Sequence, residues 1–175
     1  MQVTRLLTEE DAPRIAELMR RNREFFAPWD AVRDDSHYQS EGQRGIIRTG
    51  LAEYEAGQAV ILGILAPSGE VVGVISVRGI VRGAFQSGVI GYWVGMEYNG
   101  RGLASTAVAE VKELAFTRLA LHRLQAETMP ENHASQRVLQ RNGFQQYGRA
   151  PQYLKIAGKW EDHLLFQVLA TDGDR

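Results

Sequence analysis

Two glycines in a short run are the residues of this chain best suited to chemistry. Residues 99–102 read Asn-Gly-Arg-Gly, and they stand between the β-rich run 89–94 and a stretch of helical periodicity that begins at Leu103. A helix start presents unpaired N–H groups and about half a unit of positive charge, and glycines let a ligand approach the main chain. Arg101 can add forked donors for phosphate oxygens. The run indicates an anion site, most often for phosphate, unless the glycines only form the connection.

The sequence around this run excludes two common phosphate loops. A Walker loop requires Gly-Lys followed by Ser or Thr, which is missing here. The dinucleotide fingerprint requires a third glycine or alanine after two spacers, where Ser105 stands. Another kind of phosphate-binding turn is therefore expected.

A second group of residues follows at 132–144. Asn132 is a good helix cap, Ser135 falls at the third helical position, and Gly143 suits the end of the helix. Taken alone, the segment can be explained as a short capped helix without any chemical role.

The elements that must position these groups can be predicted from periodicity and turn residues. Strands are expected at 3–7, 59–65, 71–77, 89–94 and 122–129, with a closing hairpin at 144–154 and 160–169. Helices are expected from Thr8, from Ser36 as N-cap to Gly57, from Leu103 to about Arg118, and from Asn132 to Asn142. The strand, helix and strand between 89 and 129 should form a parallel crossover. The other sequential strands form an antiparallel meander.

Two further features allow both a structural and a functional interpretation. The aromatic residues Phe25, Phe26 and Trp29 flank Pro28, and they either floor a pocket or fill the gap between two helices. Glu127 alternates with the polar residues of strand 122–129, so it is either a solvated carboxylate or a catalytic one.

Length and composition bound the class of protein. The 175 residues suit one domain, and a net charge of −1 predicts no general attraction to nucleic acid or to an anionic membrane. The absence of cysteine excludes disulfides, thiolate metal sites and a cysteine nucleophile, and the four scattered histidines suggest no metal cluster. Because neither a signal region nor a spanning apolar run is visible, a cytoplasmic location is expected.

The glycine run and the later segment together resemble a known family. Asn99-Gly100-Arg101-Gly102-Leu103-Ala104 is similar to the acetyl-CoA pyrophosphate loop of GNAT acyltransferases, with asparagine in place of the usual first Gln or Arg. Asn132-x-x-Ser135 followed by Gly143-Phe144 is similar to a second GNAT signature. Residues 121–123, 129–130, 153–154 and 158–163 resemble the RimJ and RimL branch, the ribosomal-protein N-terminal acetyltransferases. The likeness extends over the whole chain.

The resemblance implies a fold and a set of site residues. The fold would be α+β, a single GNAT domain over residues 1–175, whose twisted sheet has about seven mostly antiparallel strands, one splayed parallel pair and about four flanking helices. Acetyl-CoA, and no metal, would lie in the splay. The residues expected to contact it are Trp93, Val94, Gly95, Met96, Asn99, Gly100, Arg101, Gly102, Leu103, Ala104, Asn132 and Ser135. Those expected at the acceptor are Phe25, Phe26, Trp29 and Tyr92.

The implied reaction is direct attack of a primary amine on the thioester. Attack requires the neutral amine, which at pH 7 is roughly 14% of an α-amine but about 0.04% of a lysine. A protein N-terminus is therefore the expected acceptor, with a small amine or a non-catalytic CoA-binding sensor as alternatives. Ser135 would help the thiolate leave, a backbone N–H near Val94 or Gly95 would face the oxyanion, and Glu127 or a water would accept the proton. The protein would be a monomer or a homodimer.

Overall fold

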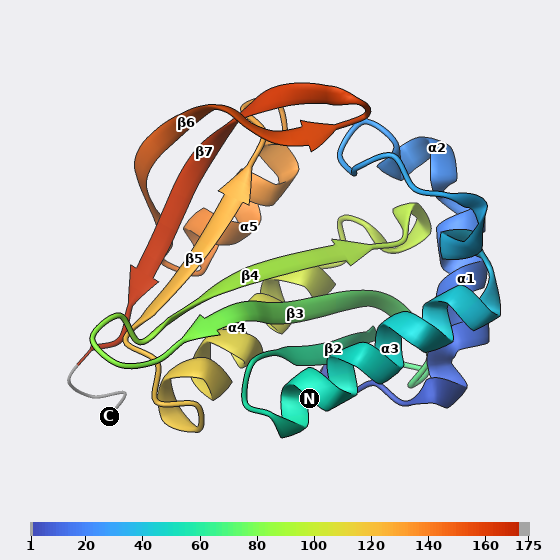
Figure 1. Ribbon diagram of the computed structural model, residues 1–175, viewed down its shortest axis with the longest axis horizontal. Coiled ribbons are helices and arrows are strands. Elements are labelled where there is room, and N and C mark those ends of the chain that lie inside the picture. Colours follow the sequence, from blue (N-terminus) through green and yellow to red (C-terminus); the bar gives the residue numbers. More distant parts are fainter. Residues whose placement is uncertain (1, 172–175) are drawn as a thin grey trace.

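A seven-stranded sheet in the order β1-β2-β3-β4-β5-β7-β6 forms the centre of the structure (Figure 1). The structure, a computed structural model, describes residues 2–171, so residues 1 and 172–175 of the expected domain lie outside it. The strands are β1 Thr4–Leu6, β2 Val60–Leu65, β3 Val71–Val81, β4 Ser87–Val94, β5 Arg123–Thr128, β6 Gln145–Ile156 and β7 Lys159–Leu169. The α-helices are α1 Ala12–Arg21, α2 Arg23–Phe26, α3 Ser40–Glu55, α4 Leu103–Thr117 and α5 His133–Arg141. Three 3-10 turns, η1 Glu9–Asp11, η2 Asp35–Tyr38 and η3 Met96–Tyr98, complete the elements.

The pairing of the strands confirms the predicted mixed sheet. Neighbouring strands are antiparallel except for β4 and β5, which are parallel and joined through α4. Strands β2, β3 and β4 form the expected meander, and β6 with β7 forms the closing hairpin. The pattern therefore places the C-terminal end of β4 next to the glycine run and the start of α4.

Helices cover both faces of the sheet and bury two separate apolar clusters. On one face α4 buries its predicted stripe, which includes Ala107, Val108 and Val111, together with Leu139 of α5. On the other face α1 and α3 contribute residues such as Ile15 and Ile47. Burial of this kind stabilises a domain by roughly 25 cal/mol per Å² of apolar surface. Strand β4 contributes to both clusters, with Val94 on one face and Trp93 packed against the other.

Two details of the helices differ from the sequence prediction. Helix α3 begins at Ser40, and the expected cap Ser36 instead lies in the 3-10 turn η2, which Asp34 caps by accepting from the Ser36 N–H at 2.9 Å. Between α1 and Pro28 the chain also forms the short helix α2, which ends at Phe26. None of the helices found in residues 2–171 is long and apolar enough to cross a membrane.

Candidate active site

The parallel strands β4 and β5 separate shortly after they begin. Their register extends only over Ser87–Val89 against Arg123–Gln125. Figure 1 shows the two strands diverging from that end, with α5 behind the wide end of the gap. Because backbone groups on the facing edges lack a strand partner there, this is where a ligand can bind the main chain.

The alternation of β4 decides which of its amides face the splay. The N–H of Gly95 donates to the Val72 oxygen of β3 at 2.9 Å. In an antiparallel ladder successive residues point their amides to opposite edges, so the Val94 N–H faces the splay. The expectation that the Gly95 N–H could face the oxyanion is therefore wrong, because this N–H is already bonded within the sheet. Val94 has the required direction.

The glycine run forms an open turn at the start of α4. Gly100 and Gly102 have φ values of +75° and +78°, which residues with a Cβ adopt only with strain. A Cβ at either position would meet no other atom within 4 Å, so the turn is open to a ligand. The buried side chain of Leu103 anchors the first turn of α4, and its first N–H groups lack a helical partner. The turn at residues 99–103, called here the cradle, thus has the open backbone geometry that an anion site requires.

Two side chains of the cradle differ in their accessibility to a phosphate. Asn99 is exposed beside the turn. The guanidinium of Arg101 folds back over the preceding residues. It donates to the backbone oxygen of Glu97 at 2.9 Å and lies 5.4 Å from the centre of the Tyr98 ring. The main chain, more than Arg101, therefore forms the cradle.

A buried asparagine connects the cradle to the first helix. Asn22, which is 3% exposed, ends α1 and accepts a hydrogen bond from the Met96 N–H at 2.8 Å. Its amide nitrogen donates to the Leu18 oxygen at 2.9 Å. The N–H of Met96, one of the predicted cofactor contacts, is thus bonded within the protein, and the exposed side chain of Met96 is its accessible part.

A cavity of about 570 Å³ extends from the splay across β4 to the face that carries α1 and α3. Ser135, Asn132 and Glu127 line it at the splay, and Gly91 lines it on β4 with no atom within 4 Å of where a Cβ would stand. The volume lies within the roughly 300–1,000 Å³ of small-ligand pockets. The two sides of β4 therefore share one space.

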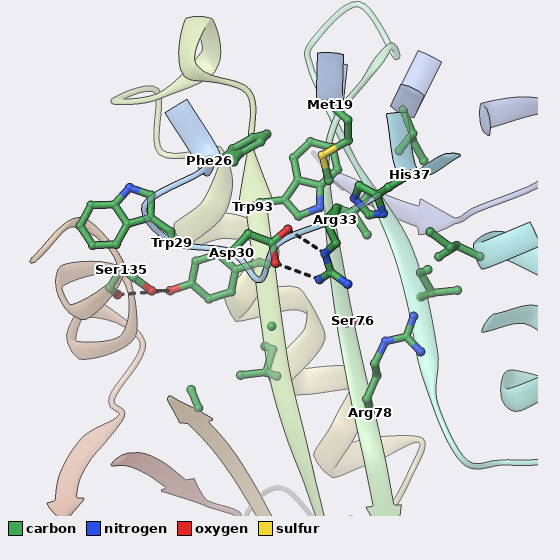
Figure 2. A pocket seen from close by; sticks show the side chains of 18 of the residues that line it. Met19, Phe26, Trp29, Asp30, Arg33, His37, Ser76, Arg78, Trp93 and Ser135 are labelled. Atoms are coloured by element: carbon green, nitrogen blue, oxygen red, sulfur yellow. Dashed lines mark hydrogen bonds and ion pairs between the residues drawn. The ribbon is translucent and has the colours of Figure 1, made fainter. Parts of the chain in front are cut away.

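Aromatic side chains form much of the cavity wall. Phe26, Trp29 and Trp93 line it, and the rings of Phe26 and Trp93 meet edge to face at 5.3 Å (Figure 2). Phe25 is not part of the lining; it packs against Phe26 with ring centres 5.3 Å apart. The pocket interpretation of this segment is thus correct for Phe26 and Trp29, while Phe25 only contacts a residue of the wall.

A hydrogen-bonded pair spans the splay between β4 and α5. The Tyr92 hydroxyl lies 2.9 Å from the Ser135 Oγ and donates to the Ser135 backbone oxygen at 3.2 Å (Figure 2). Asn132 caps α5 as predicted, because its side-chain oxygen accepts from the Ser135 N–H at 3.1 Å. Burial raises the pKa of Tyr92 to about 12, an effect that the hydrogen bond to Ser135 partly opposes. Tyr92 therefore remains a neutral hydroxyl at physiological pH.

Glu127 lies at the cavity rather than on a solvated face. Burial raises the pKa of its carboxyl group, while a hydrogen bond from the Tyr153 hydroxyl at 3.4 Å and the nearby His163 oppose this rise. A raised pKa makes a carboxylate a better proton acceptor near neutral pH. The structure thus places Glu127, Tyr92 and Ser135 in the lining of one cavity.

Several lining residues were missed by the sequence reasoning. Asp30 and Arg33 form an ion pair at 2.8 Å in the loop after α2, and Ser76 and Arg78 project from β3. The sequence held a signal for both pairs. Asp30 and Arg33 are three positions apart, a spacing that allows an ion pair, and Ser76 and Arg78 interrupt an apolar strand at alternate positions.

Comparison with known proteins gives this arrangement a family. Residues 3–145 match the family described as Acetyltransferase (GNAT) domain. The chain belongs to the GNAT acetyltransferase family. It is 37% identical to the probable N-acetyltransferase YjcK of Bacillus subtilis (strain 168) over 172 residues, 98% of this chain and 95% of that protein.

Two further similarities are with proteins of the RimJ type. Over 173 residues the GNAT chain is 35% identical to the [ribosomal protein uS5]-alanine N-acetyltransferase of Escherichia coli (strain K12), covering 97% of this chain and 88% of that protein. The solved structure of Mycobacterium smegmatis RimJ in complex with CoA-disulfide superposes with a TM-score of 0.91 at 30% identity, covering 95% of this chain and 81% of that one.

The buried tyrosine of this GNAT chain predicts a specific pH dependence of stability. Below pH 10 the Tyr92 phenol is protonated in both the folded and the unfolded chain, so its titration does not affect the free energy of unfolding. Between pH 10 and about 12 only the unfolded chain releases the proton. The free energy of unfolding should fall by about 2 to 3 kcal/mol from this group, as denaturant titrations at several pH values would measure.

The Tyr92→Phe variant should lack that part of the decline. Tyr54→Phe, a change at an exposed tyrosine, is the matched control and should retain it. An equally steep decline for Tyr92→Phe and for the unaltered chain would contradict the assignment.

Proposed function

We propose that this chain transfers the acetyl group of acetyl-CoA to the N-terminal α-amine of a protein, with a ribosomal protein as the expected acceptor. The observation that carries the proposal is the single cavity that joins the splay of β4 and β5 to the aromatic wall across Gly91. It would let a thioester from one side and an amine from the other meet over β4. The relatives of RimJ type support this acceptor class, and such an acceptor would be met in the cytoplasm.

The cofactor would be held mainly by the main chain. The open turn at Gly100 and Gly102 would receive the diphosphate on the free amides of α4, and the edge of β4 at Tyr92 and Val94 would bind the pantetheine arm. Asn132, at the start of α5, would contact the arm from the opposite side of the splay. When bound, acetyl-CoA supplies an activated acyl group and a thiolate leaving group.

The reaction would be direct attack in a ternary complex. The amine nitrogen forms a bond to the thioester carbon, the carbon–sulfur bond breaks, and the surplus proton of the amine passes to Glu127 or to a water beside it. The Val94 N–H would stabilise the charge on the carbonyl oxygen. With the cofactor bound, the single proton of the Tyr92 hydroxyl would turn from the Ser135 backbone oxygen to the Ser135 Oγ, so that the serine O–H can donate a hydrogen bond to the departing thiolate.

The function is tested by measuring thiol release from acetyl-CoA with a panel of acceptors. Short peptides with a free N-terminus should be acetylated, whereas lysine-bearing peptides with a blocked N-terminus should not, because far less of a lysine is neutral at pH 7. Turnover restricted to small amines would show that the acceptor is a small molecule and not a protein N-terminus. CoA binding without turnover of any amine would indicate a sensor.

A substitution in the cradle should weaken cofactor binding. Gly102→Ala places a Cβ in the open turn and strains a residue with φ of +78°, so the affinity for CoA measured by calorimetry should fall at least about tenfold. Gly69→Ala is the matched control, because Gly69 has φ of +85° and an equally open surrounding in the turn between β2 and β3.

Both glycine variants should lose a similar amount of stability, about 1–2 kcal/mol, from the left-handed backbone. Only Gly102→Ala should lose CoA affinity. Equal CoA affinities for the two variants would remove the turn from the cofactor site.

Removal of the serine hydroxyl should affect the rate more than binding. Ser135→Ala should lower kcat by at least about tenfold while CoA affinity changes by less than about twofold, because the hydroxyl acts on the sulfur only as the bond breaks. Ser68→Ala, in the exposed turn before Gly69, is the control for loss of a hydroxyl. Parallel losses of rate and CoA affinity would exclude Ser135 from the chemical step.

A further inference from the structure

The cavity has a polar end that the proposed reaction does not use. Arg33, His37, Ser76 and Arg78, called here the basic end, lie beyond Trp93 and away from Ser135 (Figure 2). Arg33 reaches in from the loop after α2, and Ser76 and Arg78 rise from β3. Polar side chains on a covered face of a sheet are costly to bury unless they find partners.

The donors of the basic end are only partly committed. Arg33 uses Nε and Nη2 on Asp30, at 3.1 and 2.8 Å, and Arg78 uses Nη1 on Glu53 at 2.8 Å. A guanidinium has five N–H donors, so each retains some that can reach a ligand. The Nε2 atom of His37 is buried and finds no hydrogen-bond partner among residues 2–171.

The one carboxylate that lines this end among the described residues, Asp30, is already bonded. Both carboxylate oxygens of Asp30 bind Arg33, and one of them also accepts from the Ala31 N–H at 2.8 Å. The basic end therefore offers more donors than acceptors. Arg33 and Arg78 each keep one carboxylate partner, Asp30 and Glu53, and a guanidinium with further free donors can bind a second carboxylate through two parallel hydrogen bonds.

The register of the sheet sets the distance from the reaction centre to this end. Ser76 lies directly opposite Gly91, and Arg78 lies two residues further along β3, opposite Val89. Two residues of strand correspond to about 6.6 Å. An extended peptide whose amine stands over Gly91 would thus bring its second or third side chain to the basic end.

We propose that the basic end binds the carboxylate of an aspartate or glutamate at the second or third position of the acceptor. The inference rests on the proposed function, because it assumes that the amine of a protein N-terminus stands over Gly91. It makes the enzyme selective for N-termini that carry an acidic residue close behind the acetylated one.

The test compares acceptor peptides that differ only in charge. Peptides that begin with alanine should carry glutamate, glutamine or lysine at position two, and in a second set at position three, with thiol release giving kcat/KM. At one of the two positions glutamate should exceed glutamine by about tenfold, as expected for a charge-assisted hydrogen bond. Added salt should reduce the ratio, since the arginines are partly exposed.

Variants assign the preference to the two arginines. Arg78→Gln and Arg33→Gln should each lower the ratio of glutamate to glutamine peptide towards one, and Arg78→Lys should retain part of it. Arg48→Gln is the matched control, because Arg48 forms a similar pair with Glu9 at 2.8 Å on the exposed side of α3 and should keep the full ratio.

The outcomes separate this inference from the proposed function. Turnover of peptides with a ratio near one, or a ratio that survives both arginine variants, would overturn the inference alone. Faster turnover of free alanine than of any peptide would indicate that the basic end binds the α-carboxylate of a small acceptor, and it would overturn the inference of an acidic peptide residue. No turnover with any peptide would overturn both proposals.

Discussion

The divergence of β4 from β5 is the constraint on which the site depends. Three residue pairs hold the parallel strands together, and beyond Val89 each strand continues with only its other edge bonded. A sheet that opens in this way exposes main-chain donors and acceptors at its centre, which water or a ligand must satisfy. The Tyr92 hydroxyl crosses the gap to α5 and contacts Ser135 with its only polar atom. The cavity, the cradle and the proton-bearing groups are all arranged around this opening.

Elements specified by local signals could be predicted from the sequence. The glycine turn, the cap at Asn132 and the closing hairpin depend on residues within a few positions of one another, and all three occur where they were expected. The start of α3 could not be predicted in this way. A Cβ on Gly42 would stand 2.0 Å from the Ser36 oxygen, so the chain folds tightly over that glycine before the helix begins at Ser40. Such a close approach leaves no periodic pattern.

The details of the site were less predictable because they depend on orientation. Sequence places Val94 and Gly95 side by side, but only the bond from Gly95 to Val72 shows which amide faces the splay. The charge of Arg101 suggested a phosphate contact, whereas its guanidinium lies against Tyr98. The basic end combines Arg33 and His37 with two residues of β3 that follow at least 39 positions later, so its composition becomes visible only when β3 and the segment after α2 are placed together.

The buried Asn22 couples the end of α1 to the segment that precedes the glycine turn. Its amide group holds the last turn of α1 on one side and the Met96 N–H, just before the glycine turn, on the other. A displacement of residues 96–98 must either carry the end of α1 with it or break a buried hydrogen bond, at a cost of about 1–3 kcal/mol. Because the aromatic residues of α2 follow directly after Asn22, any tightening of the glycine turn would be transmitted to the opposite wall of the cavity.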